Sequence, residues 1–166
     1  MRILTQRLEI AEWSMEMAPD VQKASLDEDT RRFVPDEVFE TLEEAQETIT
    51  FLMNAQHTPE GPFVYPVLLE GRCIGYVQAC RTQTGVEVGY HIAAEHTGKG
   101  YATEAVTAFL PVIMNERHLS CVDGIVMEEN AASIRVLEKC GFGLLFQGEG
   151  LYQGQKQSIR HYRYPR

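Results

Sequence analysis

A glycine-rich turn is the segment whose residue types and spacing best suit binding chemistry. It lies within Glu95–Ala105, between a predicted strand and a predicted helix, and has glycines at positions 98 and 100. Glycine lets the backbone turn sharply and approach a ligand closely. The amides of a first helical turn have no partner inside the helix, and the helix dipole adds positive potential. The segment therefore favours a phosphate site, although a plain strand-to-helix turn would also explain two glycines.

Other nucleotide-binding loops fit this segment less well. A Walker A loop needs GxxxxGK followed by Ser or Thr, and the chain has no such run. A Rossmann GxGxxG loop needs a third glycine where Thr103 stands. The dinucleotide reading also expects strands and helices to alternate from the start, whereas three successive strands precede this loop. A different nucleotide-binding α/β enzyme therefore remains only a minor alternative.

Hydropathy patterns predict the elements that position the loop. Alternating apolar and polar residues indicate strands, and an apolar repeat of about 3.6 residues indicates helices. Strands are expected at residues 2–10, 63–69, 73–79, 86–92, 122–127, 142–147 and 157–164, and helices within 16–34 and at 42–53, 101–113 and 131–139. Thr41 and Glu44 have capping-box spacing, Pro111 should kink or shorten its helix, and 148–150 should form the last turn. The order predicts a mixed-sheet α/β or α+β domain covered by helices.

Composition excludes several classes of protein. The 166 residues suit a single domain, residues 1–166, with 44% apolar and 23% charged residues. A net charge of -9 disfavours a nucleic-acid partner. No apolar run is long enough for a membrane span, and the first residues lack the apolar core of a signal peptide, so we expect a cytoplasmic protein with no membrane partner. Four cysteines without CxxC spacing and five histidines without HxH or HxxxH spacing predict free thiols and no metal.

The acidic residues are concentrated in the first part of the chain. Residues 1–70 contain 15 acidic and 5 basic residues, whereas residues 71–166 contain 9 and 10. Solvated helix faces would explain this asymmetry. Alternatively, the first part lines a site for a cationic acceptor and the second tolerates an anionic ligand.

Three separated motifs follow one another along the chain: Gly89–Ile92, Gly98–Ala105 and Asn130–Phe142. Together they resemble the GNAT superfamily of acyl-CoA-dependent N-acetyltransferases. Thr5–Leu8 and the helix at Thr41 also resemble the Rim-type group, which acetylates protein N-termini and, in relatives, small amines. The resemblance covers nearly the whole chain. It implies a mostly antiparallel central sheet with helices on both faces.

The resemblance also implies where acetyl-CoA, as co-substrate, would bind. The pyrophosphate loop of the family, Q/R-x-x-G-x-G/A, falls on Thr97–Ala102, with Thr97 where Gln or Arg is expected. The preceding strand would supply backbone groups to pantetheine, and Asn130 would lie near the pantetheine arm or serve only as a helix N-cap. The cofactor-binding residues expected are Ile92, Ala93, Ala94, Thr97, Gly98, Lys99, Gly100, Tyr101, Ala102 and Asn130.

The implied reaction is direct attack of a primary amine on the acetyl thioester. An ammonium is no nucleophile, so a base must take a proton directly or through water, and Glu87 on the strand before the loop is the candidate. A surface glutamate is the alternative. His91 has the same strand parity, roughly 13 Å further along, and could reach the acceptor or the cofactor, but a lone histidine on a strand is more often structural. A backbone amide near Ile92 would stabilise the carbonyl oxygen.

The sequence offers no obvious general acid to protonate the departing thiolate. Many relatives use a tyrosine seven residues after the asparagine, and this chain has Leu137 there. Ser133 could orient a proton to the sulfur, with Tyr152 as a more remote alternative. The missing tyrosine and the Thr97 departure also leave open a non-catalytic acyl-CoA sensor or partner module.

The acceptor is not identified by the sequence. A protein N-terminus, a polyamine and another small amine all fit, and a homodimer is left open because dimers are common in relatives.

Overall fold

The computed structural model describes residues 1–165. The strands are β1 (Ile3–Leu4), β2 (Leu8–Ile10), β3 (Phe63–Leu69), β4 (Arg72–Thr82), β5 (Gly85–Ile92), β6 (Val122–Met127), β7 (Gly143–Tyr152) and β8 (Gln155–Tyr164). The helices are α1 (Ala18–Ser25), α2 (Glu28–Phe33), α3 (Leu42–Ala55), α4 (Tyr101–Glu116) and α5 (Ala131–Lys139). Short 3₁₀ turns occupy Met15–Met17, Pro35–Glu37 and Ala94–His96. None of the helices in this described part is long and apolar enough to cross a membrane.

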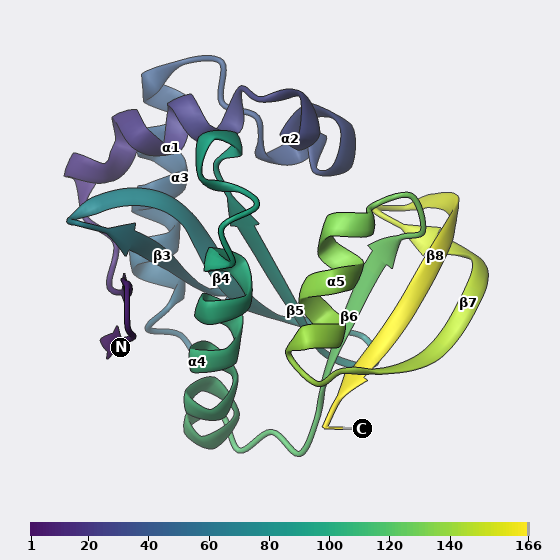
Figure 1. Ribbon diagram of the computed structural model, residues 1–166. Helices are drawn as coiled ribbons and strands as arrows, with labels where there is room; N and C mark the ends of the chain where they lie inside the picture. Colours follow the sequence, from purple (N-terminus) through teal and green to yellow (C-terminus); the bar gives the residue numbers. More distant parts are fainter. Residues whose placement is uncertain (166) are drawn as a thin grey trace.

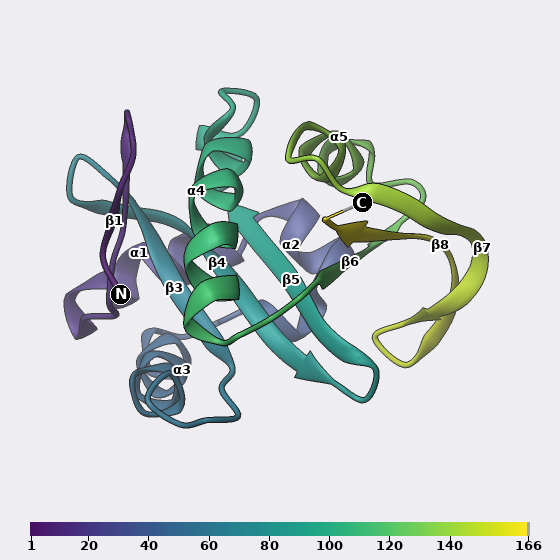
Figure 2. The same cartoon turned by 90° about the horizontal axis from the view of Figure 1, so that it is seen from below.

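The strands form one eight-stranded sheet in the order β1-β2-β3-β4-β5-β6-β8-β7. Every neighbouring pair is antiparallel except β5 and β6, which are parallel. Helices α4 and α5 cover one face, and α1, α2 and α3 lie on the other (Figure 1; Figure 2). The predicted mixed, mostly antiparallel sheet with helices on both faces is therefore confirmed.

The parallel pair, β5 and β6, interrupts the regular pairing of the sheet next to the candidate site. Strands β5 and β6 pair at a single register position, Glu87 opposite Asp123. Beyond this pair the two strands diverge, as Figure 1 shows. Backbone groups of β5 past Glu87 are consequently not covered by β6.

Each face of the sheet has its own apolar core. The larger core packs α4 and α5 against the sheet, and the smaller one surrounds Trp13 beneath α1 and α3. The Trp13 indole donates a hydrogen bond to the Val64 carbonyl at 2.8 Å, which satisfies its buried N–H. On the other face, a Cβ at Gly124 would lie 2.9 Å from Leu137 Cδ2, so the glycine lets α5 approach β6 closely.

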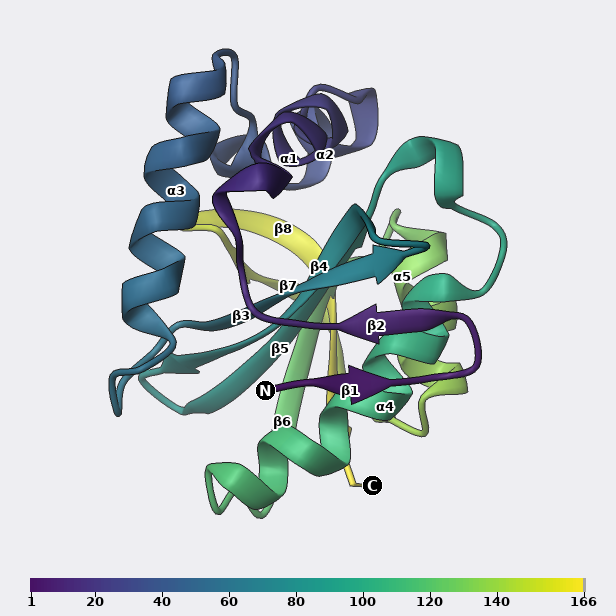
Figure 3. The ribbon, with the colours of Figure 1, turned by 90° about the vertical axis from the view of Figure 1, so that its left-hand side faces the viewer.

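The prediction of one continuous first strand is wrong. The chain instead forms two short strands, β1 and β2, that pair antiparallel at the sheet edge (Figure 3). Thr5 makes the reversal, because its hydroxyl accepts the Leu8 amide at 2.9 Å and its own amide bonds the Leu8 carbonyl at 2.9 Å.

Two further element boundaries differ from the prediction. Residues 148–150 lie inside β7, and the chain turns instead at Gln153 and Gly154, both with positive φ. A Cβ at Gly150 would lie 2.5 Å from Ile159 Cδ1, so this glycine accommodates a packed strand and not a turn. Helix α4 also continues through Pro111 to Glu116, with the proline on its exposed side.

The predicted helix starts are confirmed. Thr41 accepts the Glu44 amide at 3.2 Å while the Glu44 carboxylate accepts the Thr41 amide at 3.4 Å, which completes the capping box of α3. Asn130 accepts the Ser133 amide at 3.1 Å and so caps α5.

Candidate active site

A cleft of about 740 Å³ opens where β5 and β6 diverge. Ten predicted site residues line it: Glu87, Ile92, Ala94, Thr97, Gly98, Gly100, Tyr101, Ala102, Asn130 and Ser133. Two other predicted residues do not line it. The Ala93 amide donates to the Ile74 carbonyl at 2.8 Å, and the Lys99 ammonium donates to the Glu95 carbonyl at 3.2 Å.

The start of α4 presents a row of backbone donors to this cleft. Gly98 and Gly100 have φ values of 75° and 81°, a left-handed conformation that other residues rarely adopt. The first backbone hydrogen bond of the helix is donated by the Glu104 amide to the Gly100 carbonyl at 3.0 Å. Amides in the preceding turn have no acceptor inside the helix, so they suit an anionic phosphate group.

An arginine that sequence reasoning missed holds this turn in place. Arg7 donates from Nε to Glu104 Oε2 at 2.7 Å and from Nη1 to the Lys99 carbonyl at 2.9 Å, and its guanidinium lies 4.5 Å from the Tyr101 ring centroid. Thr5 adds a hydrogen bond to Glu104 Oε1 at 2.6 Å. The resemblance of Thr5–Leu8 to the Rim-type group was the only signal for this role.

The backbone of β5 supplies further donors. Because the Ala93 amide points toward β4 and successive amides of a strand alternate in direction, those of Ile92 and Tyr90 point the other way. That side is where β6 has diverged. The amide at Ile92 is therefore positioned to donate into the cleft, as the oxyanion prediction requires.

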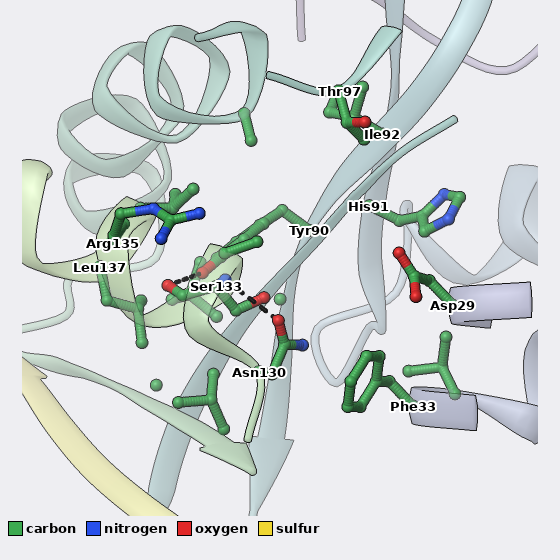
Figure 4. Close-up of a pocket in the computed structure, with 18 of the residues that line it drawn as sticks. Asp29, Phe33, Tyr90, His91, Ile92, Thr97, Asn130, Ser133, Arg135 and Leu137 are labelled. Carbon is green, nitrogen blue, oxygen red and sulfur yellow. Dashed lines mark hydrogen bonds between the residues drawn. The ribbon is translucent and has the colours of Figure 1, made fainter. Parts of the chain in front are cut away.

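Helix α5 forms the wall opposite α2. Figure 4 shows Asn130 and Ser133 across the cleft from Asp29 and Phe33. The Tyr90 hydroxyl donates to the Ser133 carbonyl at 2.9 Å, which fixes the start of α5 against β5. Asn130 uses Oδ1 for capping, so its structural role is real whether or not it also meets a ligand.

Glu87 lies on the α1–α3 face of β5, half-buried and lining the cleft. Burial raises the pKa of its carboxyl group to about 7, and the negative charge of Asp123 adds to this increase. A carboxyl group with this pKa is substantially ionised at neutral pH yet still able to hold a proton, which is the property of a general base.

Glu37 is a second carboxylate in the cleft that the sequence did not single out. It accepts a hydrogen bond from the Tyr76 hydroxyl, and burial raises its pKa to about 7, with the charge of Asp36 adding. Glu37 comes from the 3₁₀ turn after α2, and Tyr76 comes from β4, 39 residues later. Only the fold brings them together.

Two contacts tie α2 to the C-terminal half of the chain. The Tyr152 hydroxyl donates to the Phe33 carbonyl at 3.1 Å, and Arg32 pairs with Glu129 at 2.7 Å. Both Tyr152 and Phe33 line the cleft, so these contacts lie at its wall. The Tyr152 hydroxyl is thereby committed to a structural hydrogen bond.

His91 has structural partners. Its Nε2 lies 2.9 Å from Thr30 Oγ1 and its ring stacks on Tyr76 with centroids 5.8 Å apart, while burial lowers its pKa. Leu137, in the position of the family's tyrosine, is 1% exposed and packs on β6. No cluster of three or more potential metal ligands occurs within the described range, residues 1–165.

Charged side chains of both signs line the cleft. The acidic ones are Asp27, Asp29, Glu37 and Glu87, and the basic ones include Arg135 and Lys139 of α5; Figure 4 shows Asp29 and Arg135 on opposite sides. Three of the four acids belong to the acidic first part of the chain. The asymmetry seen in the sequence thus reappears in the lining of one cavity.

The splayed strand pair beside a glycine-rich helix start defines an N-acetyltransferase class of fold. The chain belongs to the GNAT acetyltransferase family, because residues 7–143 match the family model described as "Acetyltransferase (GNAT) domain".

The chain is also similar to individual proteins in sequence or in fold. The curated relative YkkB of Bacillus subtilis, an uncharacterized protein, is 42% identical over 71 residues, which span 43% of this chain but only 41% of that protein. A GNAT-family acetyltransferase from Bacillus anthracis superposes with a TM-score of 0.83 at 25% identity, covering 98% of this chain and 97% of the other. RimL, a ribosomal-protein α-N-acetyltransferase in complex with coenzyme A, shares the fold with a TM-score of 0.83 at 14% identity, covering 98% and 97%.

Proposed function

We propose that this protein is an acetyl-CoA-dependent N-acetyltransferase that moves an acetyl group to a primary amine. The observation that carries the proposal is the row of free amides at the start of α4, opening into the same cleft as Glu87. Family membership and the coenzyme A bound to the RimL neighbour support it. We also propose that residues 1–166 act as a single acetyltransferase domain.

The chain's residues fit acetyl-CoA along the length of the cleft. Amides around Gly98–Thr103 would bind the pyrophosphate, and Arg135 and Lys139 add positive charge to the cleft. The free amides of β5 at Tyr90 and Ile92 would bind the pantetheine arm and the thioester carbonyl. Asn130 and Ser133 form the other side of this path.

Glu87 accepts the proton that the acceptor must lose. Ionised Glu87 takes a proton from the ammonium directly or through water, and the freed amine lone pair attacks the thioester carbonyl. The Ile92 amide stabilises the charge that develops on the carbonyl oxygen. The C–S bond then breaks, and the products are the acetylated amine and coenzyme A.

Protonation of the departing sulfur demands little from the protein. A thiol has a reference pKa near 8.5, so the thiolate is a stable leaving group near neutral pH. We propose Ser133 as the residue that orients a proton toward it, because Leu137 has no donor and Tyr152 bonds Phe33. The cytoplasmic location and the homodimer remain predictions.

Calorimetric titration with acetyl-CoA, NAD and ATP tests the cofactor. We expect saturable binding of acetyl-CoA and no comparable binding of NAD or ATP. Absence of acetyl-CoA binding at millimolar ligand would contradict the proposal. Thiol release with pooled amines and peptides then separates an enzyme from a sensor. A sensor module would bind acetyl-CoA and release no thiol above the rate without acceptor.

A further inference from the structure

A second cavity, of about 330 Å³, lies on the face of the sheet that α1, α2 and α3 cover. Its wall is mainly apolar and includes Trp13, Val21, Phe39, Leu52 and Val64. A dry apolar cavity of about 150 Å³ is enough to bind benzene, so this space can accept a compact apolar group.

The second cavity adjoins the cleft. Four residues line both: Glu37, Tyr76, Gln78 and His91. Strand pairing places Tyr76 opposite His91, and Cys80 opposite Glu87, so that one face of β4 and β5 runs from the apolar cavity to Glu87. Gln78 lies between them over Gly89, where a Cβ would be 2.6 Å from its Nε2. A ligand in the second cavity can therefore contact side chains that also line the cleft.

Two acidic side chains line the second cavity, and one of them, Asp20, already has partners. Asp20 accepts hydrogen bonds from Arg72 and from the Cys73 amide, and Ser25 accepts the Phe39 amide at 2.9 Å. Only the Glu37 carboxylate is left to pair with a cation, so a second ammonium of a polyamine would be buried there without a counter-charge of its own, which is costly. An apolar group would not incur this cost.

Glu37 lines both cavities, and its carboxylate can bind a cation. Its Oε2 accepts the Tyr76 hydroxyl, which orients the group, and a carboxylate can accept at both oxygens. An ammonium placed against Glu37 would lie between the apolar cavity and the acetyl-transfer end of the cleft.

We propose that the acceptor is a small primary monoamine whose apolar group, about the size of one aromatic ring, occupies the second cavity while its ammonium lies against Glu37. This inference rests on the proposed acetyl transfer. Glu37 holds the cation and Glu87 receives the proton, so the two carboxylates have separate tasks. Discrimination between amines comes from the cavity on the α1–α3 face.

Trp13 reports occupancy of the cavity without any catalysis. It is the only tryptophan, it is 6% exposed, and it forms part of the cavity wall. Titration with phenethylamine should give a saturable change in tryptophan emission, whereas ethylamine at equal concentration should give none. Absence of a saturable change with phenethylamine would overturn the inference, even if acetyl transfer to another amine were established.

Kinetics with matched acceptors give the second test. We expect kcat/KM to be about 10- to 100-fold higher for phenethylamine than for ethylamine, the factor that burial of one such side chain supplies. Equal values, or a preference for spermidine or for peptides over phenethylamine, would contradict the proposal. If no amine releases thiol, the proposed function fails, and the tryptophan titration still decides whether the cavity binds phenethylamine.

A substitution that fills the cavity completes the design. Ala24 on α1 lines the second cavity and not the cleft, so Ala24→Leu should lower kcat/KM for phenethylamine about tenfold or more and leave the ethylamine value unchanged. Thr50→Leu, which places a leucine on the exposed side of α3, is the matched control and should change neither. Equal loss for both amines in Ala24→Leu would contradict the proposal. Should Ala24→Leu fail to fold, the wild-type tryptophan titration decides alone.

Discussion

Replacing Glu87 by glutamine gives the sharpest test of the proposed mechanism. The substitution keeps the size and one acceptor oxygen of the side chain but removes its basicity. Loss of a general base lowers the rate by about 100- to 10,000-fold. We therefore expect kcat at saturating acceptor to fall by at least about 100-fold at pH 8, with little change in acetyl-CoA affinity.

The pH dependence follows from the raised pKa. With a pKa of about 7, roughly one-tenth of the Glu87 carboxyl groups are ionised at pH 6 and about nine-tenths at pH 8. The ratio of wild-type to Glu87→Gln kcat should therefore rise about tenfold between these pH values. Taking the ratio removes the ionisation of the acceptor, which both proteins share.

The assay is steady-state thiol release at saturating acetyl-CoA and acceptor. Glu43→Gln, an exposed glutamate on α3 outside both cavities, is the matched control and should behave as wild type. Glu37→Gln should raise KM for the acceptor more than it lowers kcat. A constant ratio across pH, or an unchanged kcat in Glu87→Gln, would refute the assignment of Glu87 as base.

Three further changes test the supports of the site. Arg7→Ala removes the charged hydrogen bonds that hold Glu104 and the Lys99 carbonyl, so acetyl-CoA binding measured by calorimetry should weaken about tenfold; unchanged affinity would show that the turn holds its shape without Arg7. Gly100→Ala places a side chain at a φ of 81°, so the substitution should lower the free energy of unfolding in urea by about 1 kcal/mol and weaken acetyl-CoA binding. Wild-type values of both quantities would contradict this prediction. Glu37 has a folded pKa of about 7 above its ordinary 4.5, so the folded state favours its neutral form and loses that stability as pH rises from about 4.5 to 7. Glu37→Gln should therefore gain up to about 3 kcal/mol relative to wild type between pH 4.5 and pH 8, and an equal difference at both pH values would count against the buried carboxyl.

Local patterns in the sequence were sufficient for most elements and for the glycine-rich turn. Strand alternation, the capping box at Thr41 and the glycines at 98 and 100 act within a few residues, so their structural effects can be predicted without the fold. The split of the first strand was missed because a hydroxyl of Thr5 captures local backbone groups that hydropathy does not register.

Long-range pairs could not be predicted in the same way. Glu37 meets Tyr76 across 39 residues, and Arg7 meets Glu104 across 97. No period or spacing within the chain indicates such partners. The second cavity also depends on how α1 and α3 sit over β4, which is decided by packing and not by any single motif.

Direct detection of the acetylated product is the measurement that tests the central claim most closely. The protein would be incubated with acetyl-CoA and a pool of primary amines that includes phenethylamine, and the amines would be analysed by mass spectrometry. The account predicts one acetyl group added to an amine, dependent on both protein and acetyl-CoA and strongly reduced in Glu87→Gln. Tight acetyl-CoA binding with no acetylated amine above the protein-free control would contradict it.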